Sequence, residues 1–221
     1  MIRVMVADDQ KIVRSGIAVV VGAADDIEVV GEAKDGYEAV EFARELRPDV
    51  VLMDIRMPGR DGIEATRLLS ADPDGAIPVL VLTTFDLDDY VFGALEAGAA
   101  GFLLKGADEE TLIAAIRSVA SGSGTLDQRL TRRVIAEFAA RRPTPQKRRD
   151  ELASALTGRE LEILELLCEG LSNQEMATRL FIEPSTVKYH VAGLLAKIGA
   201  RDRLQAVVWA FQNGVVAPSI E

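Results

Sequence analysis

The sequence has little of what stabilises secreted proteins or crosses a membrane. It contains one cysteine among 221 residues, so no internal disulfide can form, and a reducing compartment suits the chain. That residue, Cys168, ends the apolar helical stretch Leu161–Cys168, where a buried and unreactive thiol is expected. No apolar run approaches the roughly 18 residues that span a bilayer, and no charged-then-apolar leader opens the chain. We therefore expect a cytoplasmic protein without a membrane partner.

Basic residues are scarce in the first half of the chain. Residues 1–120 hold 23 acidic and 11 basic residues, a net charge of −12. Residues 121–221 hold 12 acidic and 14 basic residues, a net charge of +2. The overall net charge of −10 hides this difference. The asymmetry indicates two domains with different partners, of which only the second would be attracted to nucleic acid.

Short apolar runs alternate with helical patterns over the first 120 residues. The runs are continuous in Val, Leu and Ile, which is typical of parallel strands buried on both faces. Five such units predict an α/β domain with a flavodoxin-like doubly wound sheet. The expected strands are Ile2–Ala7, Ile27–Ala33, Val50–Asp54, Pro78–Thr83 and Gly101–Leu104, and the expected helices are Lys11–Gly22, Gly36–Leu46, Gly62–Ser70, Asp88–Ala97 and Asp108–Ala120.

Charged residues stand where three of these apolar runs end. Asp8 and Asp9 follow the first run, Asp54 ends the third, and Lys105 follows the fifth. Because the carboxyl ends of parallel strands form one crevice, these side chains should meet there. Carboxylates beside a phosphate are ligands that Mg²⁺ prefers, and phosphoryl transfer needs mainly positioning and charge neutralisation. The cluster predicts a magnesium site with Asp54 as the nucleophile that forms an acyl phosphate, and with Thr83 as a hydroxyl donor.

These residues resemble the receiver domain of two-component response regulators. The resemblance implies that a sensor histidine kinase phosphorylates Asp54. It also implies that Thr83 and Phe102 form a switch, with Lys105 pairing to the phosphoryl group. The implied magnesium ligands are Asp8, Asp9, Asp54 and the backbone carbonyl of Arg56. The matching motifs are Asp8-Asp9, Asp54-x-x-Met57-Pro58-Gly59, Thr83 and Phe102-x-x-Lys105.

Another class of protein also uses an aspartate at a strand end. Phosphatases of the haloacid dehalogenase type need a second acid two residues after the nucleophile as proton donor. Arg56 occupies that position here, so the only catalysis expected is slow autodephosphorylation of the acyl phosphate. Arg56 and Phe85 flank the expected phosphate site. Our hypothesis is that they tune the lifetime of the acyl phosphate by limiting the access of water.

The remainder of the chain predicts a linker and a helical domain. We expect the receiver at residues 1–121, a helical and basic linker at 122–151, and an all-α four-helix domain at 152–217. Two capping boxes, Thr157–Glu160 and Ser172–Glu175, each open an amphipathic helix. The closely spaced helices Asn173–Leu180 and Pro184–Ile198 have the proportions of a helix-turn-helix, and a fourth helix is expected from about Asp202 to Phe211.

The second helix of this pair presents a polar face suited to DNA. Its apolar positions recur at helical spacing, which leaves the opposite face for a major groove. Lys188 would contact a base edge or a phosphate, and Ser185 and Thr186 at the helix start suit phosphates. The expected DNA-binding residues are Ser185, Thr186, Lys188, Tyr189 and Ala192.

The C-terminal motifs resemble the LuxR-type helix-turn-helix, and the whole chain is similar to a NarL/FixJ-type response regulator. The resemblance implies a homodimer when phosphorylated, a double-stranded operator, and RNA polymerase as a further partner. It implies that the last helix dimerises, with Leu204, Val208 and Trp209 as contacts. The matching segments are Leu156-Thr-Gly-Arg-Glu-Leu-Glu-Ile-Leu, Gly170-Leu-Ser-Asn-Gln-Glu-Met-Ala, Ser185-Thr-Val-Lys-Tyr-His-Val and Lys197-Ile-Gly-Ala-Arg-Asp-Arg-Leu-Gln-Ala.

The sequence therefore predicts a response regulator in which phosphorylation of Asp54 controls dimerisation and sequence-specific DNA binding, and so transcription. The alternative is a phosphorylation-independent regulator, or an interaction protein whose receiver only docks partners. A receiver that is never phosphorylated does not need all of the acidic, hydroxyl and lysine residues of the site. Their presence together favours the phosphorylated regulator.

Overall fold

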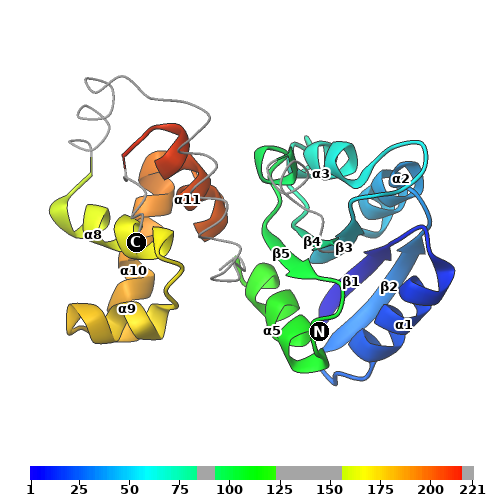
Figure 1. Cartoon of the computed structure of the whole chain (residues 1–221), viewed down its shortest axis with the longest axis horizontal. Coiled ribbons are helices and arrows are strands. Elements are labelled where there is room, and N and C mark those ends of the chain that lie inside the picture. Colours follow the sequence, from blue (N-terminus) through cyan, green and yellow to red (C-terminus); the bar gives the residue numbers. More distant parts are fainter. Residues whose placement is uncertain (84–92, 123–155, 216–221) are drawn as a thin grey trace. The chain divides into compact units, whose positions relative to one another are not determined.

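The computed structural model describes residues 1–83, 93–122 and 156–215. The chain divides into two compact units, Met1–Thr125 and Leu126–Glu221 (Figure 1). The linker predicted at residues 122–151, including its helical stretch, lies outside the described residues except at its first position.

The first unit is built on a parallel sheet of five strands. The strand order is β2-β1-β3-β4-β5, with every neighbouring pair parallel. This is the order of a flavodoxin-like doubly wound sheet, so the predicted fold class is confirmed for this unit. Only the start of the fourth strand differs from expectation. The strands are β1 Ile2–Ala7, β2 Ile27–Ala33, β3 Val50–Asp54, β4 Val79–Thr83 and β5 Gly101–Leu104.

Helices cover both faces of this sheet. α1 and α5 lie together on one face, and α2 and α3 lie together on the other (Figure 1). The helix predicted at Asp88–Ala97 begins outside the described residues. Asp108 caps α5 rather than beginning it, because its side chain accepts a hydrogen bond from the backbone of Thr111. The described helices are α1 Lys11–Gly22, α2 Gly36–Leu46, α3 Gly62–Ser70 and α5 Glu109–Ala120.

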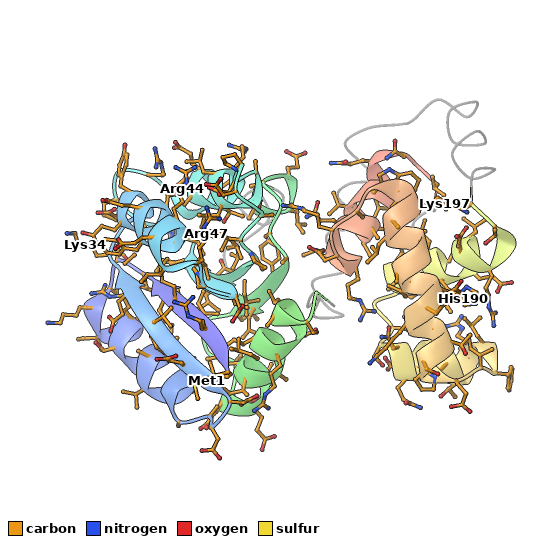
Figure 2. The ribbon with its side chains drawn as sticks, turned by 180° about the vertical axis from the view of Figure 1, so that it is seen from behind. Met1, Lys34, Arg44, Arg47, His190 and Lys197 are labelled. Carbon is orange, nitrogen blue, oxygen red and sulfur yellow. The ribbon has the colours of Figure 1, made fainter. Side chains whose placement is uncertain are left out.

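The core of the first unit runs through the middle strands. Every residue of β3 and of β4 is buried, as expected for strands with helices on both faces. At the rim, Arg44 and Arg47 from the end of α2 both bind the buried carboxylate of Asp72, at 2.7 and 3.0 Å (Figure 2). These hydrogen bonds, with Arg44 contributing most, hold the pKa of Asp72 below its usual value. They fasten the turn after α3 to the end of α2.

The second unit contains the predicted helices, and both predicted capping boxes are present. At the start of α8 and of α9, the capping side chain accepts a hydrogen bond from the backbone N–H of the Glu three residues later. The side chain of that Glu accepts one from the backbone N–H of the capping residue. Cys168 is buried, and burial raises the pKa of its thiol, which fits the unreactive role expected of it. The helices are α8 Gly158–Cys168, α9 Asn173–Leu180, α10 Pro184–Ile198 and α11 Arg203–Gln212.

Across the described parts of both units, every helix is too short or too polar to cross a lipid bilayer.

Candidate functional site

Three charged side chains meet at the carboxyl edge of the sheet. Asp8 follows β1, Asp54 ends β3, and Lys105 follows β5, so three separate strands deliver them to one crevice. The Lys105 Nζ lies 2.7 Å from Asp8 Oδ2 and 2.8 Å from Asp54 Oδ2. Both carboxylates are buried, with Asp54 only 6% exposed. The predicted convergence of acids and lysine is therefore confirmed.

The acidic residues of this crevice can hold a divalent cation. Asp8, Asp9 and Asp54 each offer a carboxylate oxygen, and these oxygens lie within 4.8 Å of one another. The buried Asp8 Oδ2 is ion-paired with Lys105 but accepts no well-directed hydrogen bond within the described residues. Such an oxygen has lone pairs to spare for a hard cation. Oxygen ligands of this kind fit Mg²⁺, which needs only one or two carboxylates when phosphate supplies further ligands.

Burial and pairing shift the charges of the site in opposite directions. Burial raises the pKa of Asp54, and the hydrogen bond and charge of Lys105 only partly offset this. Burial also works to lower the pKa of Lys105, but its hydrogen bonds to Asp54 and Asp8 outweigh that effect and raise it. Lys105 therefore stays protonated. The Lys105 ammonium is thus a fixed positive charge beside the Asp54 carboxylate.

Of the other receiver residues predicted from the sequence, Thr83, Phe102 and Arg56 lie in the described part of the chain. Thr83 ends β4 and is buried, and its carbonyl accepts a hydrogen bond of 2.7 Å from the backbone N–H of Lys105. Phe102 lies inside the core, 1% exposed. Arg56 is exposed, and its backbone N–H donates to the Asp54 carboxylate. Phe85 lies outside the described residues.

Two residues that position Asp8 were not anticipated from the sequence. The backbone N–H of Gln10 donates to Asp8 Oδ1 at 2.8 Å. Arg14 donates from Nη1 to the Asp8 carbonyl at 2.7 Å, while its Nε binds Glu32 at 2.9 Å. Arg14 thus ties the acidic turn to the end of β2. The sequence signal that could have indicated this role is Arg14 itself, a basic residue one turn into a largely apolar helix.

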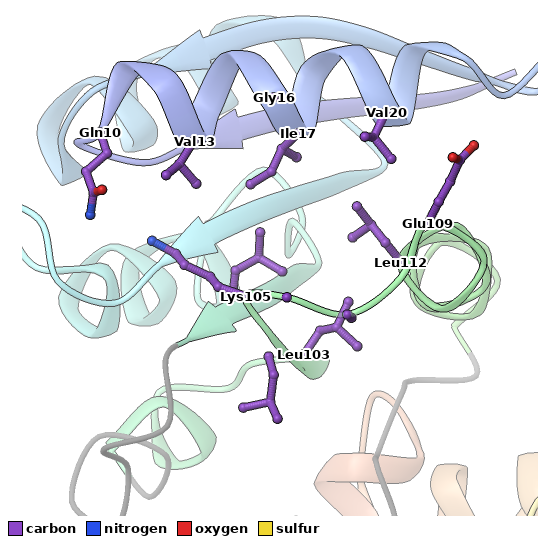
Figure 3. A pocket seen from close by; sticks show the side chains of 13 residues that line it. Gln10, Val13, Gly16, Ile17, Val20, Leu103, Lys105, Glu109 and Leu112 are labelled. Carbon is purple, nitrogen blue, oxygen red and sulfur yellow. The ribbon is translucent and has the colours of Figure 1, made fainter.

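A separate cavity of about 500 Å³ lies between α1 and the start of α5, beside the end of β5 (Figure 3). Its walls are mainly apolar, and Lys105 stands at its edge. Because the Lys105 ammonium is committed to Asp8 and Asp54, the cavity offers little charge to a phosphorylated ligand. The apolar part of the wall includes Val13, Ile17, Val20, Leu82, Leu103 and Leu112.

The second site is the exposed face of α10. Val187 and Leu194 are completely buried against the rest of the unit, which turns the opposite face outward. Tyr189 is 76% exposed, and its ring meets the ring of the adjacent His190 edge-on. Of the predicted DNA-binding residues, Ser185, Lys188, Tyr189 and Ala192 are exposed and Thr186 is half-buried.

The far end of α10 is fixed to α8. Lys197 binds Glu160, the second member of the first capping box, with Nζ 2.6 Å from Oε2. Figure 2 shows Lys197 and His190 on the same helix. The hydrogen bond to Lys197, followed by that to Thr157, lowers the pKa of Glu160 to about 2. Lys188 forms no ion pair among the described residues, so it remains available to DNA.

Two of the three predicted dimer contacts on α11 are buried within the unit itself. Leu204 is 0% exposed and Val208 is 4% exposed, because both lie on the helix face that packs into the domain core. Only Trp209 is partly exposed. A surface that joins two copies through α11 would have to use Trp209 and its exposed neighbours.

A buried carboxylate at the start of α11 makes the second unit sensitive to pH. Asp202 is 6% exposed, and burial raises its pKa to about 6, although it caps the helix by accepting from Gln205 N–H at 2.9 Å. The folded pKa exceeds the unfolded value, so ionisation destabilises the fold as pH rises from about 4 through about 6. We expect Asp202→Asn, which keeps the cap, to stabilise this unit by about 1–3 kcal/mol at about pH 7.5.

Urea unfolding followed by the fluorescence of Trp209, the single tryptophan of the chain, measures this effect in the full-length protein. The gain should disappear near about pH 3, where Asp202 is largely protonated in both the folded and the unfolded state. Asp202→Ala removes both the charge and the helix cap, so it should stabilise the unit less than Asp202→Asn does. An equal gain at both pH values would contradict the prediction.

Comparison with known families agrees with both sites. A model of response regulator receiver domains matches residues 4–117, and a model of bacterial regulatory proteins of the luxR family matches residues 154–210. The chain therefore belongs to the LuxR-family response regulators. It is a two-component response regulator with a receiver and a LuxR-type DNA-binding domain, and such a protein acts between a kinase and DNA.

Several relatives share this organisation over their whole length. The chain is 45% identical to the transcriptional regulatory protein YxjL of Bacillus subtilis, with 97% of each chain covered. It is 42% identical to the transcriptional regulatory protein LiaR of the same organism, covering 98% of this chain and 100% of LiaR. Among solved structures it is similar to response regulator ChrA of a heme-sensing two-component system. That match has a TM-score of 0.54 and 38% identity, and it covers 97% of this chain and 98% of ChrA.

Proposed function

We propose that a sensor histidine kinase phosphorylates Asp54, and that this phosphorylation controls dimerisation and sequence-specific DNA binding. The observation that carries the proposal is the buried Asp54 carboxylate held 2.8 Å from the Lys105 ammonium at the crevice of the sheet. An ion pair alone could be structural. A second buried acid on the same lysine, with a third acid at the mouth, is what phosphoryl transfer requires.

The transfer uses groups that are already in place. A carboxylate oxygen of Asp54 attacks phosphorus, the bond between phosphorus and the kinase histidine nitrogen breaks, and that nitrogen keeps the bonding electrons. Lys105 neutralises charge on the phosphoryl oxygens, and Thr83 donates its hydroxyl to one of them. Mg²⁺ held by Asp8, Asp9, Asp54 and the Arg56 carbonyl would supply the remaining positive charge. Phe102 then follows Thr83 as the second part of the switch.

The DNA-binding step uses the exposed face of α10. Its first turn has no side-chain cap, and the N–H groups of Thr186 and Val187 already donate to the Glu183 carbonyl. The backbone N–H and the hydroxyl of Ser185 can therefore bind a phosphate, with the positive end of the helix dipole behind them. Lys188 and Tyr189 reach the base edges or backbone of the operator. The protein acts as a homodimer on this operator and contacts RNA polymerase. It carries no catalytic activity beyond slow hydrolysis of its own acyl phosphate.

A direct test compares the full-length protein with and without a small phosphodonor in the presence of Mg²⁺. A DNA duplex selected from a random library by the treated protein serves as the operator. Phosphorylation should tighten binding to this duplex and convert monomer to dimer in analytical ultracentrifugation. Equal binding and an unchanged oligomeric state would favour the alternative, a regulator that acts without phosphorylation.

The exposed Arg56 gives a prediction for the lifetime of the phosphorylated state. If its side chain limits the access of water, Arg56→Asn should hydrolyse the acyl phosphate faster, by about threefold or more (~0.7 kcal/mol lower in barrier). The rate is measured by loss of radiolabel from the purified phosphoprotein. Arg67→Asn, at an exposed position of α3, serves as the matched control and should leave it unchanged. If the acyl phosphate of Arg56→Asn is hydrolysed at the same rate as that of the control, the Arg56 side chain does not limit the access of water.

A further inference from the structure

The β3–α3 loop, residues 55–61, connects the nucleophile to the helix that follows it. It begins beside Asp54 and contains Arg56, whose backbone N–H already donates to the Asp54 carboxylate. Ile55 and Met57 are buried, but Arg56, Pro58 and Gly59 are exposed and lie outside any helix or strand. The position of the Arg56 backbone therefore depends on how the two ends of this loop are held.

The end of the loop nearest α3 is held by backbone contact with the strand. Gly62 N–H donates to the Ile55 carbonyl at 2.8 Å, which closes the loop on itself. The Gly62 Cα packs so closely that a Cβ there would collide with the Asp54 carbonyl oxygen. This contact fixes where the loop returns, but not how its outer turn sits.

The outer turn is held by Tyr37, a residue of another helix. The Arg60 guanidinium carbon lies 4.4 Å from the centroid of the Tyr37 ring, within cation–π range. The same guanidinium binds Glu64, with Nε 3.2 Å from Oε1, so its orientation is fixed from two sides. The Tyr37 ring also covers Gly59, where the chain has φ +78 and a Cβ would lie 3.0 Å from the ring.

The backbone beneath Tyr37 is fixed as well. Asp35 caps α2 by accepting hydrogen bonds of 2.9 Å from Tyr37 N–H and from Glu38 N–H. Gly36 packs against the loop so tightly that a Cβ would collide with the Arg60 carbonyl oxygen. The start of α2 is therefore a rigid support for the loop that carries the Arg56 backbone.

We propose that the Tyr37–Arg60 contact positions the β3–α3 loop, whose Arg56 backbone carbonyl would be one of the ligands of Mg²⁺, and thereby sets the affinity of the receiver for Mg²⁺. This inference rests on the proposed phosphoacceptor function and extends it to two residues outside the acidic cluster. Tyr37 is 56% exposed, so its contact contributes little buried area to the core. Its main effect is local, on the exposed turn of the loop at Gly59 and Arg60.

The test measures Mg²⁺ binding to the full-length protein by isothermal titration calorimetry, with Mg²⁺ itself as the probe. Tyr37→Ala is expected to raise the Kd for Mg²⁺ by about tenfold, the lower end of the range for residues that support metal ligands. Arg60→Gln should do the same. The double variant should be no weaker than the single ones, because both changes remove one contact. Tyr37→Phe keeps the ring and should bind like the wild type.

Phe181→Ala removes an exposed aromatic side chain from the second unit and is the matched control, with no expected effect on Mg²⁺ binding. Calorimetric melting without Mg²⁺ checks that each variant is folded, and Arg60→Gln keeps the test valid if Tyr37→Ala unfolds. If the wild type binds Mg²⁺ and both variants bind it equally well, the inference is overturned. If the wild type itself binds no Mg²⁺, the metal part of the proposed function fails instead.

Discussion

The Asp54→Asn protein is expected to take up no phosphate from a small phosphodonor, a loss of about 100-fold or more relative to the wild type. The amide of asparagine has no anionic oxygen to attack phosphorus, and phosphoryl transfer to an uncharged nucleophile loses several kcal/mol of barrier reduction. Operator binding by this variant should not respond to the phosphodonor. Phosphate incorporation is measured by intact mass, and DNA binding by fluorescence anisotropy.

The fold should survive this change. Asp54→Asn removes a buried charge whose pKa is already raised by burial, and Lys105 keeps Asp8 as an ionic partner at 2.7 Å. Asp61→Asn is the matched control, because asparagine caps the start of α3 as well as aspartate does and Asp61 lies outside the acidic cluster. Phosphate uptake by Asp54→Asn at the rate of Asp61→Asn would show that another residue accepts the phosphoryl group.

Gly62→Ala is expected to destabilise the first unit by about 3 kcal/mol or more. A Cβ at this position would collide with the Asp54 carbonyl oxygen and lie 2.9 Å from Ile55 Cα, and both atoms belong to the backbone. A side chain can rotate away from such a collision, but the end of β3 cannot move without breaking its pairing with β4. Differential scanning calorimetry of the full-length protein should show the receiver transition at a lower temperature.

Gly158→Ala provides a matched control for this prediction. Gly158 also occupies the first position of a helix directly after the capping residue, but a Cβ added there would meet no neighbouring atom within 4 Å. That substitution should leave both units as stable as before or slightly more so, by up to about 1 kcal/mol. Equal melting of the two alanine variants would mean that the loop after β3 can yield, and that Gly62 does not hold it.

The sequence was sufficient for the fold and for the acidic site because both depend on simple patterns. Buried parallel strands require continuous apolar runs, and an ionisable residue at the end of such a run is costly without a role. Asp8, Asp54 and Lys105 were therefore predictable as neighbours although they are far apart in the chain. The same holds for the two capping boxes, in which both partners lie within one helical turn.

The supporting contacts could not be predicted in this way. The Tyr37–Arg60 contact joins residues on two different elements, and neither residue breaks a local pattern. The role of α11 could not be predicted for another reason. Helical periodicity correctly places Leu204 and Val208 on one apolar face, but it cannot say whether that face meets the domain's own core or a second copy. In the folded unit that face packs into the core.

The location of Lys105 has a mechanical consequence. The lysine follows β5, a strand of four residues at the edge of the described sheet, bonded to β4 alone. The side chain binds two carboxylates, and the backbone N–H binds the end of β4. A central strand would resist displacement through two ladders, whereas β5 resists through one. A phosphoryl group that displaced Lys105 would therefore act on an edge strand held through one ladder, and this strand also contains Phe102.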